Sequence, residues 1–245
     1  MTKVKKKEIL ITSVAKLLEI MQQHLYPDEM NPGKFIYRGV KKYEYKLLPS
    51  IGRLMEKQND IFDNKEKLFE FEKSAFNEFC INVYNELREN NKFTLLAVAQ
   101  HHGLKTRLLD WTFSPLIALF FAVEDKNSFE IDGALYAYQT QFTFNNFKNL
   151  DSPFDENLDE YHFLHAPYLT PRIKAQNGVF QLFKNPAKEF SDGYNFYKYK
   201  IPAENKIEIK RELNDLGISY KTLYPDFDGL CYSINYEKFC IDHGK

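Results

Sequence analysis

The sequence is poor in cysteine: only three of its 245 residues are Cys, and no two of them stand at the C-x-x-C spacing of a zinc ribbon. Because the count is odd, a disulfide framework is not expected, and free thiols fit a reducing compartment such as the cytoplasm. The chain also lacks an apolar run of about 18 residues, the length that a membrane span requires. Its charged N-terminus is not followed by the apolar stretch of a signal peptide. We therefore expect a cytoplasmic protein without a membrane partner.

An excess of charge of either sign is lacking as well, since 33 Lys and Arg residues face 34 Asp and Glu residues. A net charge of -1 gives no electrostatic footprint for binding duplex nucleic acid. The sequence also contains no P-loop, no G-x-G-x-x-G and no G-x-S-x-G motif. Aromatic residues are plentiful, with 22 Phe and 16 Tyr but a single Trp, which indicates a large buried area per residue.

Apolar residues recur with helical spacing in some segments and with strand character in others. The expected helices span residues 9–25, 65–89, 95–102, 116–124 and 204–216. The expected strands span residues 35–37, 106–110, 133–138, 179–183 and 197–201. Residues 140–169 are polar, aromatic and irregular, so we expect a loop or insertion there. The sequence predicts a single α+β domain over residues 1–245, with residues 1–33 as an N-terminal helical extension.

The first candidate site is the segment Tyr37-Arg38-Gly39, at the end of the first expected strand. A buried Arg is costly unless its charge is paired, so Arg38 requires either a carboxylate of the protein or an anionic ligand. Its planar guanidinium suits a carboxylate or a phosphate, and Gly39 leaves room for the close approach of a backbone or a ligand. Both interpretations stay open, and Asp226 and Asp228 are the best candidate protein partners.

The second candidate site is the block from residue 100 to residue 112, which concentrates polar groups between two apolar helices. Polar side chains that converge in apolar surroundings usually mark a binding or catalytic site. The candidate side chains are Gln100, His101, His102, Arg107, Asp110, Trp111 and Thr112. A structural interpretation also stays open, in which Arg107 and Asp110 pair with each other or with Arg38, and Trp111 packs in the core. Adjacent side chains on a helix point about 100° apart, so only one of the two His is expected to face a ligand.

Histidines and the later motifs give weaker signs of chemistry. His162 and His165 are three residues apart, but no Glu or Asp stands at a zincin-like position, so we expect no metal. Residues 171–180 are typical of a turn that leads into a strand, with Gln176 near its start. If this segment has a structural role alone, we expect it to form the edge of a hairpin.

Together these blocks resemble the FRG-domain family, whose Phe-Arg-Gly motif stands here as Tyr37-Arg38-Gly39. The likeness is closest in the central block and the helix after it, and it covers residues 34–230, most of the chain. The matching segments are residues 99–103, 106–112, 114–115, 118–122, 172–180 and 224–229. The central block is specific to the family, whereas Tyr-Arg-Gly alone would not be.

The FRG pattern is in turn similar to the ADP-ribosyltransferase fold of the arginine-first type, which implies a split sheet with flanking helices. In that fold an Arg at the end of an early strand holds a phosphate of NAD. A second strand ends in Ser or Thr before an Ala- and Phe-containing helix, and a third strand carries a catalytic Glu. By order, the resemblance gives the first position to Arg38, the second to the segment Asp110-Trp111-Thr112 and the third to Gln176. Because Gln176 is neutral where Glu is expected, either another carboxylate such as Asp110 serves or the chain binds without catalysing.

The resemblance implies an ADP-ribosyltransferase-like enzyme that uses NAD to modify a macromolecule. Its catalytic residues would be Arg38, Asp110, Thr112 and Gln176. Its NAD site would include Tyr37, Arg38, Gly39, Gln100, His101, His102, Arg107 and Trp111. The acceptor would be RNA, DNA or protein, in a toxin or phage-defence setting with an antitoxin or regulatory partner.

Two alternatives to this enzyme remain. One is a non-catalytic module of the same fold that binds a nucleotide, RNA or a protein, which the neutral Gln176 favours. The other is a metal-dependent nuclease or hydrolase, which depends only on the histidines.

Overall fold

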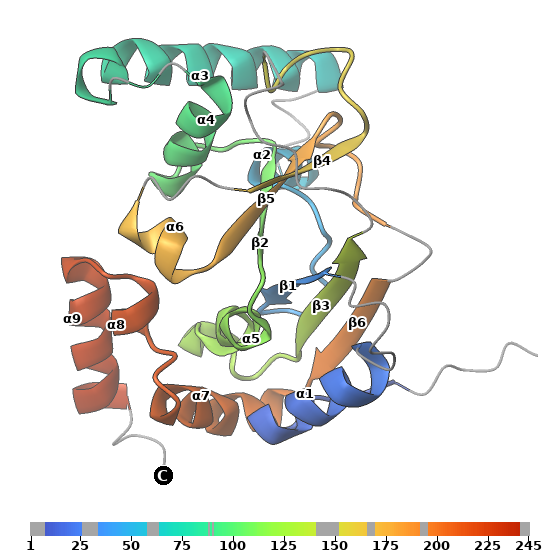
Figure 1. The fold of residues 1–245 in the computed structure, drawn as a ribbon, viewed down its shortest axis with the longest axis vertical. Coiled ribbons are helices and arrows are strands. Elements are labelled where there is room, and N and C mark those ends of the chain that lie inside the picture. Colours follow the sequence, from blue (N-terminus) through green and yellow to red (C-terminus); the bar gives the residue numbers. More distant parts are fainter. Residues whose placement is uncertain are drawn as a thin grey trace, which may run out of the picture.

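The computed structural model has one antiparallel sheet with helices around it, which confirms the expected α+β class (Figure 1). It describes residues 8–25, 34–57, 64–87, 89, 91–140, 152–165, 170–191 and 196–240. Among these residues, no helix combines the length and the apolar character needed to cross a membrane.

The elements follow the expected order, with bounds that differ by a few residues from those predicted. The helices are α1 (Val14–Ile20), α2 (Ser50–Lys57), α3 (Lys65–Leu87), α4 (Lys92–His101), α5 (Pro115–Val123), α6 (Pro171–Ala175), α7 (Lys206–Asp215), α8 (Tyr220–Leu223) and α9 (Phe227–Asn235). Short helical turns of other types are η1 (Met21–Leu25), η2 (Lys126–Ser128), η4 (Ala203–Asn205) and η5 (Tyr236–Cys240). The strands are β1 (Lys34–Val40), β2 (Leu108–Thr112), β3 (Gly133–Thr140), β4 (Tyr161–His165), β5 (Gly178–Phe183) and β6 (Phe196–Ile201).

The six strands form one sheet in the order β4-β5-β2-β1-β3-β6. β1 pairs with β3 along the whole of Lys34–Val40, but it meets β2 at one pair, Tyr37 opposite Thr112. The sheet is therefore continuous, yet it consists of two well-paired halves, β4-β5-β2 and β1-β3-β6, joined by a narrow junction. Figure 1 shows β1 and β2 running apart from this junction.

Helix α5 lies against the centre of the sheet because its sequence is apolar on nearly every side. Ser114 caps its start, with the side-chain Oγ accepting a hydrogen bond from the backbone N–H of Ile117 at 3.4 Å, and Pro115 occupies the first turn. A Cβ on Gly39 would lie 1.7 Å from the carbonyl oxygen of Ala118. Glycine at this position is therefore required for the contact between β1 and α5, which fixes where α5 ends.

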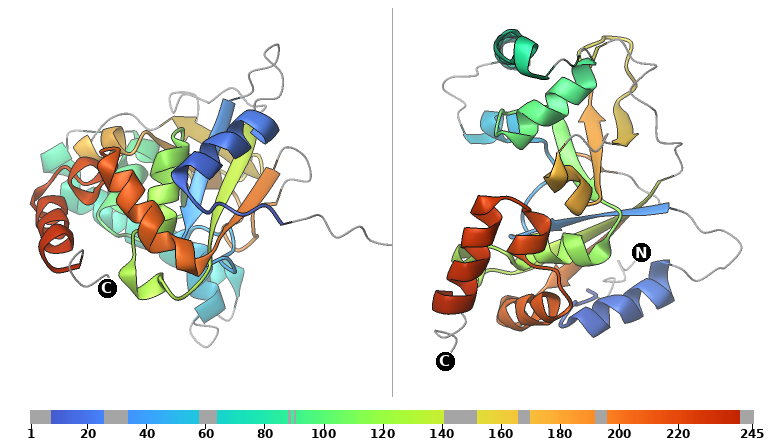
Figure 2. Two further views of the ribbon diagram at one scale, coloured as in Figure 1. Left: turned by 90° about the horizontal axis from the view of Figure 1, so that it is seen from below. Right: turned by 60° about the vertical axis from the view of Figure 1, so that its left-hand side comes forward.

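The other helices cover the two halves of the sheet separately. α1 and α7 pack beneath the β1-β3-β6 half, and their residues Leu17, Ile209 and Leu213 join the cluster around α5. Figure 2 shows α1 and α7 together on this side. α3 and α4 cover the β4-β5-β2 half, where Phe76 and Phe93 pack in a second cluster with strand residues. Since α1 shares the core of the sheet, the described part of residues 1–33 packs as an integral part of the domain.

Two local expectations differ from the structure. Residues 161–165, expected within a loop, form the edge strand β4, and residues 141–151 and 166–169 lie outside the described part of the chain. The segment expected as a hairpin turn contains the short helix α6, which Thr170 caps by accepting from the N–H of Ile173. These segments are short, so no repeating apolar pattern could distinguish strand, turn and helix there.

Candidate functional site

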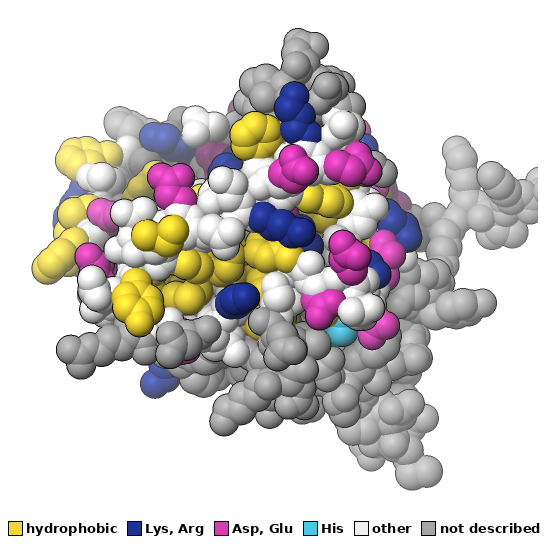
Figure 3. Space-filling model, turned by 90° about the horizontal axis from the view of Figure 1, so that it is seen from above, with side chains coloured by type: hydrophobic (Ala, Val, Ile, Leu, Met, Phe, Trp, Pro, Cys, Tyr) yellow, Lys and Arg dark blue, Asp and Glu magenta, His cyan; other side chains and the backbone are white. Residues whose placement is uncertain are grey.

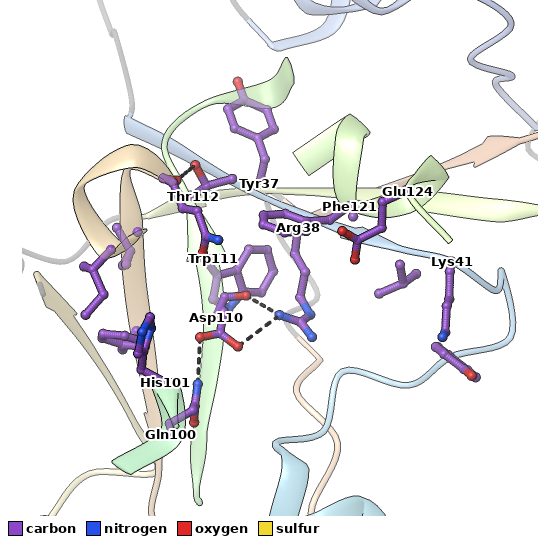
Figure 4. Close-up of a pocket in the computed structure, with 18 of the residues that line it drawn as sticks. Tyr37, Arg38, Lys41, Gln100, His101, Asp110, Trp111, Thr112, Phe121 and Glu124 are labelled. Carbon is purple, nitrogen blue, oxygen red and sulfur yellow. Dashed lines mark hydrogen bonds and ion pairs between the residues drawn. The ribbon is translucent and has the colours of Figure 1, made fainter. Parts of the chain in front are cut away.

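A cavity of about 630 Å³ lies at the junction between the two halves of the sheet. The ends of β1 and β2 and the start of β5 form one wall, and α4, α5 and α6 supply side chains around it. The segment after β1, together with α2, completes the lining. The cavity thus brings the Tyr37-Arg38-Gly39 motif and the block around Asp110 to one place, as the sequence predicted (Figure 4).

Arg38 projects from the end of β1 toward Asp110 (Figure 4). Its Nη1 donates a hydrogen bond to the backbone carbonyl oxygen of Asp110 and lies 4.0 Å from the carboxylate Oδ2 of the same residue. Burial lowers the pKa of the guanidinium to about 10, although the Asp110 carboxylate favours its charged form. Arg38 therefore stays positively charged at neutral pH. A planar guanidinium has five N–H donors, so donors remain for a bound anion after these contacts.

The partner of Arg38 is Asp110, so the expectation that Asp226 or Asp228 would pair with it is wrong. Asp226 instead caps α9, where its Oδ1 accepts from the N–H of Gly229 at 2.8 Å. Asp228 lies in the first turn of the same helix. The other pairing that the sequence left open, between Asp110 and Arg38, is the one that the structure shows.

Gln100 holds the Asp110 carboxylate in a small network. Its Nε2 donates to Asp110 Oδ1 at 2.6 Å, and its Oε1 accepts from the hydroxyl of Thr106. The Asp110 side chain is 62% exposed, so the network lies at the mouth of the cavity and is open to solvent. Its two carboxylate oxygens thus face Gln100 and Arg38, and the network orients the Arg38 fork.

Positive side chains outnumber negative ones around the cavity. The basic lining residues are Arg38, Lys41, Lys46, Arg53 and Arg172, and the acidic ones are Glu44, Asp110 and Glu124. Burial also lowers the pKa of Arg53, whose charge acts against that of Arg38. Cations that repel one another in a partly buried space gain when an anion binds between them. The cavity therefore favours an anionic ligand.

Thr112 and Gln176 lie together, as expected, but both already have partners inside the protein. The Thr112 hydroxyl donates to the backbone carbonyl of Gln176 at 2.8 Å and accepts from the N–H of Ser114 at 3.1 Å. The Gln176 side-chain Nε2 donates to the carbonyl of Leu223 at 3.2 Å. These contacts tie the end of β2 to α5, α6 and α8. They give Thr112 and Gln176 a structural role that the sequence did not reveal.

The aromatic residues divide between the core and the cavity. Tyr37 and Trp111 are only 1% and 2% exposed, and the Trp111 ring packs against Tyr138 and Phe190, with its Nε1 donating to Gln181 at 2.8 Å. The packing of Trp111 in the core was the structural interpretation left open by the sequence. Phe121 on α5 is only partly buried and lines the cavity.

The two adjacent histidines face different surroundings. His101 is half-buried and lines the cavity, whereas His102 is exposed and does not line it. Burial lowers the pKa of His101, and the nearby positive charges of Arg172 and His102 act in the same direction. His101 therefore enters the site mainly as a neutral ring, and it is the one of the pair that can meet a ligand.

Arg107 lies away from the cavity, and the structure supports the structural interpretation of it. Its guanidinium donates to both carboxylate oxygens of Glu72, with Nη2 at 2.7 Å from Oε2, and its backbone N–H donates to Glu72 Oε1 at 2.8 Å. Both side chains are almost fully buried. This pair fastens α3 to the start of β2, and so it positions the strand that carries Asp110.

Of the two histidines considered for a metal, the structure describes the side chain of His162 alone. His162 is buried in β4, and its Nε2 accepts from the N–H of Asp159 at 3.0 Å. The side chain of His165 lies outside the described part. Among the side chains that are described, no group of three His, Cys, Asp or Glu is placed to hold a metal ion.

The structure adds one residue that the sequence analysis missed. Glu124 follows the last residue of α5 and lines the cavity, and Figure 4 shows its carboxyl group beside the space that contains Arg38. Its Oε2 accepts a hydrogen bond from the Tyr224 hydroxyl at 3.1 Å. Burial raises the pKa of Glu124 to about 7, against the opposing effects of Tyr224, Lys210 and Arg172. An acidic residue directly after an all-apolar helix was the available signal, because such a side chain sits beside buried structure.

Comparison with known proteins supports one family. The sequence model of the FRG domain matches residues 33–130, a stretch that runs from the start of β1 past α5. It includes Arg38, Gln100, Asp110 and Glu124, whereas Arg172 and Gln176 lie beyond it. No functionally curated protein and no solved structure matches the chain. The chain therefore carries an FRG domain at residues 33–130, which supports its resemblance to the FRG-domain family.

Proposed function

We propose that this FRG-domain protein is an ADP-ribosyltransferase-like enzyme that uses NAD to modify a macromolecule. The resemblance implies three neighbouring strand ends: an Arg, a Ser or Thr before a helix, and a third catalytic position. Here Arg38 lies near the end of β1, Thr112 ends β2 shortly before α5, and Gln176 lies just before the start of β5. The three strands are neighbours in the order β5-β2-β1, which supports this correspondence.

The observation that carries the proposal is the Arg38 guanidinium in a cavity where basic side chains outnumber acidic ones. Two phosphate groups of NAD present several oxygens with negative charge, and an Arg fork binds such groups through paired hydrogen bonds. Arg53 and Lys41 border the same cavity and add positive charge. An anion bound there would relieve the repulsion among these cations, so a diphosphate is the chemistry that fits best.

The rest of the cavity suits the remainder of a dinucleotide. Its volume of about 630 Å³ lies within the range of roughly 300–1,000 Å³ that is typical of ligand sites. The half-buried Phe121 and the neutral ring of His101 offer surfaces against which a planar ring can pack. The buried Trp111 supports the cavity indirectly. Its hydrogen bond to Gln181 of β5 fixes the position of β2.

The acceptor class is part of the proposal, with RNA, DNA and protein as the alternatives. Figure 3 shows one face of the molecule, the side on which α3 lies in Figure 1, where basic, acidic and hydrophobic side chains are interspersed. The described side chains on that face form no uniform basic stripe of the kind that tracks a nucleic-acid backbone. A toxin or phage-defence setting with an antitoxin or regulatory partner remains part of the same proposal.

The test uses NAD labelled on its adenylate phosphate, incubated with the purified protein and a cell lysate. Digestion of the products with nuclease or with protease identifies the acceptor. We expect label on a macromolecule with the wild-type protein and none with Arg38→Ala. NAD binding by the Arg38→Ala protein should be weaker by roughly 100-fold or more, because two charge-assisted hydrogen bonds are lost.

Arg211→Ala is the matched control, because Arg211 lies on α7 and pairs with Glu208 on the surface. This variant should transfer label as the wild type does. Both variants are checked for folding by thermal unfolding. Equal NAD binding by wild type and Arg38→Ala would contradict the proposed phosphate role.

A non-catalytic module that binds a nucleotide, RNA or a protein is the second candidate. The observation in its favour is Gln176, which is neutral and whose side chain is held by the carbonyl of Leu223. In that case wild-type protein would bind NAD or another nucleotide, and all label would stay in intact NAD. The labelling experiment therefore separates the two candidates.

A further inference from the structure

The transferase proposed above lacks a carboxylate at its third strand, and the structure offers another one on the same cavity. Asp110 has both oxygens turned to other groups, since Gln100 donates to Oδ1 and Arg38 lies near Oδ2. Glu44 lines the cavity but is exposed. Glu124 is the remaining acidic lining residue, and it is shielded from solvent on most sides. It is therefore the acidic group best placed to meet a ligand inside the cavity.

The backbone of Glu124 is held firmly in place. Its carbonyl oxygen accepts from Lys210 Nζ at 2.7 Å and from the Tyr220 hydroxyl at 2.8 Å. The helix before it is fixed on β1 by the close approach of Gly39 to Ala118. The position of this residue is thus set by three separate elements, which is the rigidity that a group acting on a bound substrate requires.

The side chain of Glu124 is held on one oxygen only. The Tyr224 hydroxyl donates to Oε2 at 3.1 Å, and burial raises the pKa of that phenol, so it remains a donor. Among the described residues, no hydrogen-bond donor contacts Oε1. Tyr224 is itself oriented by Arg172, whose guanidinium lies 4.1 Å from the ring centroid. One carboxyl oxygen therefore anchors the group, and the other is left for a proton or a ligand.

The charges around Glu124 keep its two protonation states close in free energy. Burial favours the neutral acid, and Asp125 adds repulsion, while Tyr224, Lys210 and Arg172 favour the carboxylate. Lys41 on the segment after β1 and Tyr220 on α8 are the further titratable neighbours. The balance brings the pKa to about 7, where a group exchanges protons most effectively at neutral pH.

Building on that transferase activity, we propose that Glu124 is its general base. In the transfer, the bond between the ribose C1′ and the nicotinamide nitrogen breaks, and its electron pair leaves with neutral nicotinamide. A bond forms between C1′ and an oxygen or nitrogen of the acceptor. The proton of that acceptor O–H or N–H group passes to Glu124, which then releases it to solvent. No further reactant is needed.

The experiment compares wild type, Glu124→Gln and Glu124→Asp for NAD binding and for the rate of label transfer between pH 5.5 and 9. Gln keeps an oxygen acceptor for Tyr224 but takes up no proton. We expect Glu124→Gln to bind NAD as the wild type does while its transfer rate falls by roughly 100-fold or more. The wild-type rate should rise with pH through about 7, as the carboxyl ionises, and the Gln variant should lack this rise. Glu124→Asp should retain part of the rate.

Glu208→Gln, on the exposed face of α7, is the control for loss of an acidic residue. Wild-type transfer with an unchanged rate in Glu124→Gln would overturn the general-base role and leave the transferase proposal intact. A parallel loss of NAD binding and of thermal stability in Glu124→Gln would assign the residue to structure instead. No transfer by the wild-type protein in any lysate would overturn both proposals.

Discussion

Replacing Glu124 by Gln should make the protein more stable at neutral pH, and the effect should grow with pH over a defined window. The carboxyl group is buried against Tyr224, and burial disfavours its charged form. The folded protein therefore holds this proton more tightly than the unfolded chain does. Between the two pKa values, unfolding releases a proton, so the free energy of unfolding of the wild type falls as the pH rises.

The size of this change in the free energy of unfolding follows from the shift in the pKa of Glu124. The pKa rises from 4.5 to about 7, a difference of about 2.5 units, and each unit corresponds to about 1.4 kcal/mol. Below pH 4.5 the group is protonated in both states, and above pH 7 it is ionised in both, so the change lies between these limits. The wild type should lose about 3 kcal/mol of this contribution across the window, while a Gln side chain cannot titrate.

Urea unfolding followed by circular dichroism at half-unit steps from pH 4.5 to pH 8.5 measures this contribution. The quantity of interest is the free energy of unfolding of Glu124→Gln minus that of the wild type. We expect it to increase by about 3 kcal/mol across the range and to level off above pH 7. Glu208→Gln should show no such trend, because that side chain is 63% exposed. A difference that stays constant with pH would mean that Glu124 ionises normally in the folded protein.

Three further variants test the packing and the charge pairs that position the site. Gly39→Ala should destabilise the fold by about 3 kcal/mol or more in thermal unfolding, since its Cβ would lie 1.7 Å from the Ala118 carbonyl and α5 would have to move. Glu72→Gln should cost roughly 3–5 kcal/mol in urea unfolding, because it leaves the Arg107 guanidinium buried without a carboxylate; a change below about 1 kcal/mol would contradict that pairing. Asp110→Asn should leave stability nearly unchanged and tighten NAD binding roughly 2- to 5-fold in calorimetry, because the exposed carboxylate no longer offsets the charge of Arg38. Weaker binding would instead show that orienting the Arg38 fork matters more than its net charge.

Local sequence patterns were sufficient to predict those elements that a few neighbouring residues define. Ser114 followed by Pro115 marked the start of α5, and its apolar sequence marked it as central, both of which the structure confirms. The edge strand β4 and helix α6 were not recognised because each has only five residues. Segments of that length do not complete enough turns or alternations to show a period.

The partners of charged residues required the folded arrangement. Arg107 pairs with Glu72 across 35 positions of sequence, and this pairing depends on how α3 crosses the start of β2. The sequence correctly joined Arg38 with the block around Asp110. It did not show which polar groups were already satisfied within the protein, as those of Thr112 and Gln176 are.

The two carboxyl groups near Arg38 have different surroundings, and this difference bears on the choice between an enzyme and a binding module. Asp110 is solvent-exposed and is held by Gln100 and Arg38, so its main effect is to orient the guanidinium. Glu124 is held by a phenol in a buried position, which leaves both of its protonation states accessible near neutral pH. A site that only bound an anion would gain nothing from a second acidic group on its lining, because that group repels the ligand whenever it is ionised. A site that transfers a proton during the reaction requires such a group, and pairs of carboxyls in unlike environments divide these tasks in other enzymes. The presence of Glu124 on the anion-binding cavity therefore favours a catalytic role over binding alone.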